Sequence, residues 1–204
     1  MITIIDYGVG NIFAFQNVYK RLDIPTKIAR SAADLNEVEK LILPGVGSFD
    51  YAMNQLNSSG MREILDELVL DKKVPVIGIC VGMQMMGNRS DEGELDGLKW
   101  IDAEILKFDE RLIQQRTKLP HMGWNDVDPV EDHPLFIGLE KEAIFYFLHS
   151  FYFQCSNSTD SIAVSDYGVS FSSAVNKDNI YGVQFHPEKS HQFGEKLLYN
   201  FANI

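Results

Sequence analysis

Short apolar runs alternate with amphipathic segments through the first half of the chain. The runs at 2–6, 26–29, 40–43 and 75–79 are bounded by Gly, Pro or Asp, as is typical of strands buried on both faces. Segment 11–21 has apolar residues close to helical spacing, and in 61–69 they recur at i, i+3, i+4, i+7 and i+8. This alternation predicts βα units on a largely parallel sheet.

The pattern changes at about Trp100 to short alternating strands separated by turns, clearest at 144–153, 162–167, 169–176 and 180–185. We expect antiparallel pairing there. A final helix is predicted from about His191, with Phe193, Leu197, Leu198 and Phe201 on the face that closes the sheet. The sequence contains no repeat or linker, so we expect one α/β domain over residues 1–204.

Composition narrows the functional classes. The 204 residues carry 29 acidic and 18 basic side chains, a formal charge of −11, which disfavours nucleic acid and membrane surfaces as partners. There is no apolar run of membrane-spanning length and no signal-like leader, so a cytoplasmic location is expected. The two cysteines, Cys80 and Cys155, form no CxxC and no zinc-like cluster with histidine. We predict no metal site and no cofactor.

The most informative segment is Gly78-Ile-Cys-Val-Gly82, which joins a predicted buried strand to a probable helix. A G-x-C-x-G at that junction has the form of a nucleophile elbow, in which side chains at the glycines would clash with neighbouring backbone. A helix that begins just after the sulfur would favour the thiolate of Cys80. The pentapeptide alone fits a buried structural cysteine between two turn glycines equally well.

A nucleophile requires a base, and His186 is the best candidate among the five histidines. It lies at the carboxyl end of a predicted strand and precedes Pro187 and Glu188, so the 186 and 188 side chains are predicted to project to one side. Glu188 could then orient the imidazole. Oxyanion donors are predicted in the amide of Val81 and in the turn at 44–47, which could also be an ordinary strand-terminating turn.

Together these motifs identify a resemblance that covers almost the whole chain. Segments 5–11, 43–49, 78–84, 120–125, 147–150 and 182–190 closely resemble the glutaminase-subunit family of imidazole glycerol phosphate synthase, a class I glutamine amidotransferase of histidine biosynthesis. The elbow and His-Pro-Glu are shared by the class I superfamily. Pro-Gly-Val-Gly and His-Met-Gly-Trp-Asn are specific to this subunit. The resemblance implies a flavodoxin-like, mostly parallel central sheet flanked by helices.

The resemblance also implies a mechanism. Cys80 would attack the side-chain amide of glutamine, with His186 as general base and then acid and Glu188 as its orienter. A thioester would form, ammonia would leave, and water would release glutamate. Gly47 and Gln84 match positions that hold glutamine, His149 and Ser150 line the same pocket, and Val46 and Val81 lie where the oxyanion is bound.

The implied partner is a (β/α)8-barrel cyclase, which would form a heterodimer with this chain and receive ammonia through an internal tunnel. The complex would make imidazole glycerol phosphate and AICAR. The residues that match the partner-facing surface are Asn11, His121, Met122, Gly123, Trp124 and Asn125. Without the resemblance, Trp124 would be interpreted as a core or rim aromatic. His121 and His149 would be interpreted as structural histidines.

Other functions stay open from the sequence. Val81 stands where leucine is more usual in the family, and 97–102 departs from the usual Gly-Leu-Gly-rich stretch, although neither change touches the triad. A paralogous subunit could supply ammonia to an amidine-forming synthase of surface-polysaccharide sugars. A cysteine peptidase or deglycase of related fold, and a docking subunit without catalysis, are the remaining alternatives.

Overall fold

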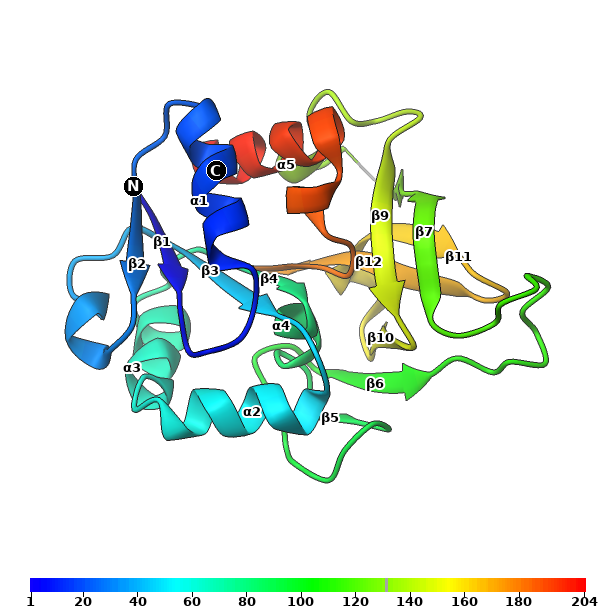
Figure 1. Cartoon of the computed structure of the whole chain (residues 1–204), viewed down its shortest axis with the longest axis horizontal. Coiled ribbons are helices and arrows are strands. Elements are labelled where there is room, and N and C mark those ends of the chain that lie inside the picture. The colour runs from blue at the N-terminus through cyan, green and yellow to red at the C-terminus, as the bar shows by residue number, and fades with distance from the viewer. Residues whose placement is uncertain (131) are drawn as a thin grey trace.

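A central eleven-stranded sheet organises the computed structural model, which describes residues 1–130 and 132–204 (Figure 1). Its main path runs β2-β1-β3-β4-β13-β12-β10-β6-β5. The first five strands of this path are mutually parallel, and β12, β10 and β6 continue it in antiparallel pairing. The bounds on the path are β1 (Ile2–Ile5), β2 (Thr26–Ala29), β3 (Lys40–Gly45), β4 (Val76–Cys80), β5 (Arg89–Ser90), β6 (Ala103–Lys107), β10 (Phe151–Cys155), β12 (Ser170–Lys177) and β13 (Ile180–Val183).

Four further strands complete the second half of the chain. β11 (Ser161–Asp166) pairs with β12 and with the short β8 (Asp128–Pro129). β7 (His121–Asp126) and β9 (Ile144–His149) form a separate antiparallel hairpin-like pair, in register from His121 opposite His149 to Asp126 opposite Ile144. The predicted mostly parallel sheet with antiparallel strands in the second half is therefore confirmed, except that β13, expected to pair antiparallel, pairs antiparallel only with β12 and lies parallel to β4.

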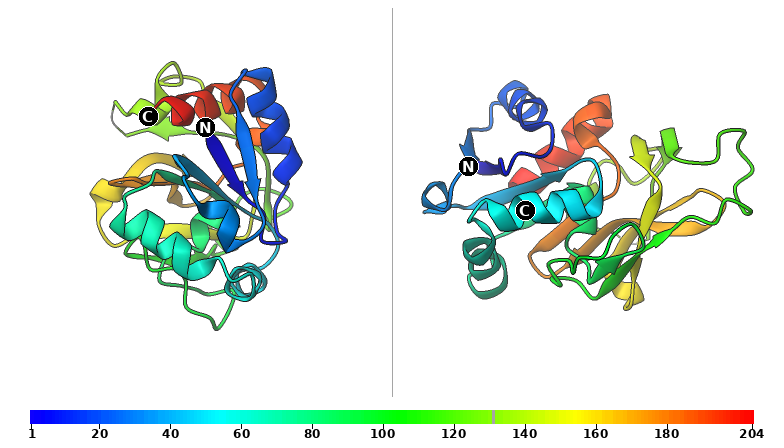
Figure 2. Two further views of the ribbon diagram at one scale, coloured as in Figure 1. Left: turned by 90° about the vertical axis from the view of Figure 1, so that its left-hand side faces the viewer. Right: turned by 60° about the horizontal axis from the view of Figure 1, so that its bottom comes forward.

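Helices cover both faces of the parallel strands (Figures 1 and 2). α1 (Ile12–Arg21) and α5 (His191–Asn203) lie side by side on one face, and α2 (Phe49–Ser58) and α3 (Arg62–Asp66) lie on the other. The short α4 (Val81–Gln84) follows β4 directly. Because both faces are covered, the inner parallel strands β1, β3, β4 and β13 are buried almost completely, which explains their continuous apolar runs, whereas the edge strand β2 is partly buried.

Three elements differ from the sequence expectation. α2 was not predicted, although its buried residues Phe49, Ala52, Met53 and Leu56 have helical spacing. The segment expected to be one strand over 144–153 is two strands, β9 and β10, which belong to different sheets and are separated at Ser150. The helix expected over 61–69 is formed by α3 and a following π-helical turn, Glu67–Asp71.

The final helix agrees with its prediction, since α5 begins at His191 and buries Leu197, Leu198 and Phe201. Within the two described segments of the chain, no helix is long and apolar enough to cross a bilayer.

Candidate active site

Cys80 occupies a strained turn at the end of β4. Its φ of +54° and ψ of −114° are unusual for a residue with a side chain, and α4 begins at the next residue. The predicted clashes at the flanking glycines are present. A Cβ on Gly78 would lie 2.7 Å from Gly82 O, and one on Gly82 would overlap the Leu43 carbonyl oxygen. The elbow therefore depends on close contact of α4 with β4 and β3.

The Cys80 side chain opens into a cavity of about 320 Å³. Eight residues predicted from the sequence line this cavity: Val46, Gly47, Cys80, Val81, Gln84, His149, Ser150 and His186. Five residues that the sequence did not single out complete the lining: Glu92, Pro120, Leu148, Phe151 and Lys189. The structure thus brings together residues that are up to 140 positions apart, from Val46 to His186, around one sulfur atom.

His186 and Glu188 form the expected pair. His186 follows β13, Pro187 begins a short 3₁₀ turn, and Nδ1 of His186 lies 2.9 Å from Glu188 Oε1, with both side chains almost fully buried. Burial alone would lower the pKa of His186, but its hydrogen bonds with Cys80 and Glu188 and their negative charges outweigh this and raise the pKa to about 10. At neutral pH the imidazole is therefore protonated and can deliver a proton inside the cavity.

The partner-facing residues predicted on β7 divide into two groups. Met122 and Trp124 are exposed, at 61% and 46%, and Trp124 stacks on the ring of His191. Gly123 and Asn125 are partly exposed, and Asn11 lies exposed just before α1. His121 differs from the surface expectation because its ring is 3% exposed and is stacked between Phe147 and Tyr167. It supports the surface from beneath.

His121 and His149 form a buried pair next to the cavity. His121 Nδ1 lies 2.9 Å from His149 Nε2, and His149 Nδ1 lies 2.8 Å from Phe151 O, to which it can only donate. Burial lowers the pKa of His121 to about 4, and burial together with the charge of its neighbour lowers that of His149 to about 3. Both rings are neutral at pH 7, so His149 forms part of the cavity wall, with His121 behind it, without adding charge.

Comparisons with known proteins assign the family. Residues 3–204 match the family model described as glutamine amidotransferase class-I. The chain belongs to that family. It is 58% identical to the imidazole glycerol phosphate synthase subunit HisH of Bdellovibrio bacteriovorus, over 204 residues and 100% of both chains. The HisH subunit of Leptospira interrogans is 48% identical, again over 100% of each chain.

Solved structures show the same fold at low sequence identity. A putative GMP synthase protein from Thermoplasma acidophilum superposes with a TM-score of 0.73 at 24% identity, covering 99% of this chain and 92% of that one. The PurLQS structure from Thermotoga maritima gives 0.74 at 14% identity, with 99% and 97% covered. The predicted class I amidotransferase architecture is therefore confirmed.

Two polar residues of this class I amidotransferase escaped the sequence reasoning. Glu92 lines the cavity and accepts a hydrogen bond from Phe49 N, the first residue of α2, at 2.8 Å. Gln184 is fully buried beneath Cys80 and Gln84. The available signal for Gln184 was a polar side chain inside an otherwise apolar predicted strand, 180–185. Glu92 lies in an acidic loop whose sequence contains no motif that distinguishes it from the neighbouring acidic residues.

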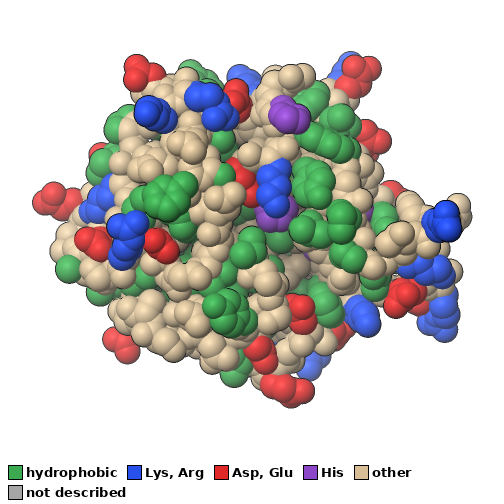
Figure 3. Space-filling view, in the orientation of Figure 1, with side chains coloured by type: hydrophobic (Ala, Val, Ile, Leu, Met, Phe, Trp, Pro, Cys, Tyr) green, Lys and Arg blue, Asp and Glu red, His purple; other side chains and the backbone are tan. Residues whose placement is uncertain are grey.

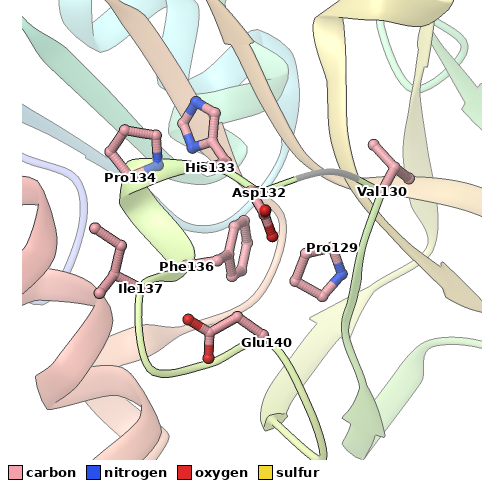
Figure 4. Close-up of a pocket in the computed structure, with 8 residues that line it drawn as sticks. All are labelled: Pro129, Val130, Asp132, His133, Pro134, Phe136, Ile137 and Glu140. Atoms are coloured by element: carbon pink, nitrogen blue, oxygen red, sulfur yellow. The ribbon is translucent and has the colours of Figure 1, made fainter.

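A second cavity of the amidotransferase, of about 580 Å³, shares no lining residue with the first (Figure 4). His133, the titratable ring in its wall, accepts a hydrogen bond from Leu135 N and lies 3.3 Å from Asn176 Oδ1. Both ring nitrogens are thus engaged in holding the 3₁₀ turn Pro134–Phe136 against β12. The lining residues are Pro129, Val130, Asp132, His133, Pro134, Phe136, Ile137 and Glu140.

Proposed function

We propose that this class I amidotransferase hydrolyses glutamine at Cys80 and supplies the ammonia to imidazole glycerol phosphate synthesis in the histidine pathway. The observation that carries the proposal is the placement of Cys80 and His186 on the lining of one cavity, with Glu188 behind His186 and 2.9 Å from its Nδ1. The names and 58% and 48% identities of the HisH relatives support the pathway.

In the first half of the reaction, the Cys80 sulfur attacks the side-chain amide carbon of glutamine, and the amide oxygen becomes an oxyanion. Backbone N–H groups at Val81 and in the Val46–Gly47 turn are the proposed donors to that oxygen. The intermediate collapses when the C–N bond breaks and protonated His186 gives its proton to the leaving nitrogen, which departs as ammonia. A thioester on Cys80 remains.

In the second half, His186 is neutral and accepts a proton from a water molecule whose oxygen attacks the thioester carbon. The C–S bond then breaks, glutamate is released, and the thiolate and imidazolium are restored. Glu188, 2.9 Å from Nδ1, holds the ring with Nε2 toward the reacting atoms and stabilises each imidazolium state.

The charges of the cavity suit the other end of glutamine. Glu92 provides a carboxylate and Lys189 an ammonium group on the lining of the same cavity. A free amino acid carries an α-ammonium and an α-carboxylate, so one group of each sign gives both a partner. Gln84, Gly47, His149 and Ser150 are proposed to enclose the side chain between these ends and Cys80.

The proposed partner is a (β/α)8-barrel cyclase, docked as a heterodimer on the face that carries Met122, Trp124 and Asn11. Hydrophobic side chains gather on the face shown in Figure 3, near a histidine and a basic side chain. Met122 and Trp124 are the large exposed apolar side chains of β7, and such residues are frequent interface anchors. We further propose a single domain over 1–204, a cytoplasmic location and catalysis without metal or cofactor.

Replacement of Cys80 by alanine tests the proposal in the reconstituted complex with a barrel cyclase. We expect glutamine-dependent synthesis of imidazole glycerol phosphate to fall to background, while synthesis from added ammonium salts continues at the wild-type rate. Retained glutamine hydrolysis in Cys80→Ala would refute the assignment of Cys80 as the nucleophile. Hydrolysis by the wild type without any transfer to the cyclase would instead favour an amidine-forming synthase as the acceptor.

A further inference from the structure

Gln184 is a fully buried amide in direct reach of the nucleophile. It follows β13, two residues before His186, and its exposed fraction is 0%. Nε2 of Gln184 lies 3.8 Å from Cys80 Sγ, and Oε1 accepts a hydrogen bond from Gln84 Nε2 at 3.0 Å. Most buried polar side chains are hydrogen-bonded, and here both ends of the amide contact residues of the cavity.

The direction of these hydrogen bonds is fixed by a backbone carbonyl. Gln84 Nε2 also donates to Phe151 O at 3.0 Å, and a carbonyl oxygen can only accept. The Nε2 atom of Gln84 must therefore face Phe151, and its second hydrogen is donated to Gln184 Oε1. Because Gln184 receives that hydrogen on its oxygen, its NH₂ group is the one presented to Cys80.

The sulfur of Cys80 therefore contacts one hydrogen-bond acceptor and one donor. The acceptor suits the neutral thiol, and the donor suits the charged thiolate. Leu148 O, at 3.8 Å, can accept a hydrogen bond from the thiol but has nothing to offer the thiolate. The Gln184 amide donates, and a donor favours the charged form of the group it contacts. In a buried site such a contact is worth more than in water.

We propose that Gln184 is a positioning residue, which holds the thiolate of Cys80 with its NH₂ group and fixes the Gln84 amide with its oxygen. The proposal rests on the proposed glutaminase function and deepens it, because Gln184 touches no substrate and acts through Cys80 and Gln84. Among the described residues no hydrogen bond engages Gln84 Oε1, so the fixed amide keeps an acceptor available at the cavity wall.

Several ionisable groups surround the same sulfur and must be considered in any pH profile. His186 and Glu188 act from the turn after β13, and Tyr7, whose pKa is raised by burial and by the charge of Cys80, acts from the loop after β1. The remaining ionisable groups on the cavity lining are Glu92, His149 and Lys189. None of these residues is replaced in the Gln184 variants, and Gln184→Met adds no ionisable group, so a change in its profile reports the lost donor.

The test measures the rate at which iodoacetamide alkylates Cys80 as a function of pH, read by peptide mass spectrometry so that Cys155 is counted separately. Gln184→Met removes the donor at similar volume, and Gln184→Glu replaces it with an acceptor. We expect the alkylation midpoint to rise by about one pH unit in Gln184→Met, a ten-fold loss of thiolate below the midpoint, and by more in Gln184→Glu. Gln154→Met, at an exposed position of β10, is the matched control and should keep the wild-type profile.

Folded Gln184 variants with an unchanged midpoint would overturn the proposal. If neither variant folds, the wild type supplies the test through its side-chain amide resonances, since the Gln184 signal should titrate with the alkylation midpoint and stop doing so in Cys80→Ala. If the chemical shift of the Gln184 side-chain amide does not change with pH in the wild type, the proposal is also overturned. Labelling needs no glutamine turnover, so a failed glutaminase assay and a failed role for Gln184 remain distinguishable.

Discussion

Gly78→Ala probes how closely the elbow must be packed. Its new Cβ would lie 2.7 Å from Gly82 O and 2.8 Å from both Gly82 C and Met83 Cα, where ordinary contact begins at 3.4 Å. All three obstacles are backbone atoms, so α4 must retreat by about 0.6–0.7 Å from β4. Overpacking of this kind costs about 1–3 kcal/mol of unfolding free energy.

The same retreat moves Val81 and its amide relative to the Val46–Gly47 turn. Because a misplacement of about 1 Å at a reacting centre costs on the order of 100-fold in rate, we expect glutamine hydrolysis in the complex to fall by about 10- to 100-fold. Steady-state kinetics and urea unfolding measure the two effects separately.

Gly60→Ala is the matched control for the loss of stability. A Cβ at Gly60 meets nothing within 4 Å, yet its φ of +73° strains an alanine, so we expect a loss of about 1 kcal/mol with full activity. Wild-type kinetics in folded Gly78→Ala would refute the reasoning, because α4 would then tolerate the displacement. An equal loss of activity in Gly60→Ala would show that stability alone controls the rate.

Three further results are expected. Glu188→Gln should lower kcat for glutamine by about 100- to 10,000-fold in steady-state assays of the complex, with folding intact, since the imidazolium loses its counter-charge. The pKa values of His121 and His149 are lowered to about 4 and 3 in the folded chain. As the pH drops below about 6.5, these histidines take up protons in the unfolded chain before they do so in the folded one, so we expect the free energy of unfolding to fall between about pH 6.5 and 5. Urea titrations should show this slope, and His121→Gln should reduce it; an unchanged slope would contradict the neutral pair. Trp124→Ala should weaken cyclase binding by about 30-fold in calorimetry, whereas Tyr199→Ala, at a similarly exposed aromatic on α5, should not.

The parallel half of the fold and the tight turn at Cys80 were predictable because their signals are local. A buried strand, two glycines around a cysteine and a His-Pro-Glu turn each constrain the backbone over a few residues. The roles of Gln184 and Glu92 were not predictable, because each depends on what lies across the sheet or the cavity. His121 was assigned to the partner-facing surface through the family resemblance of segment 120–125, whereas alternation along β7 turns its ring inward.

The division of 144–153 into two strands shows why periodicity cannot reveal this site. Buried positions continue at every second residue from Phe145 through Phe147 to His149, and Phe153 is buried in the same phase, so the pattern gives no sign of a break at Ser150. The break between the two strands depends on tertiary structure, because β9 pairs with β7 while β10 joins β6 and β12 in the main sheet.

The crossing from one sheet to the other creates the wall that the chemistry uses. Leu148 O faces the Cys80 sulfur, and Phe151 O receives hydrogen bonds from both Gln84 and His149. A continuous strand over these residues would direct alternate carbonyls into one ladder and would leave the Gln84 amide and the His149 ring without a common acceptor. The Phe151 carbonyl sets the direction of the Gln84 amide directly and of the Gln184 amide through it, so the donor that faces Cys80 follows from the point at which the chain changes sheets.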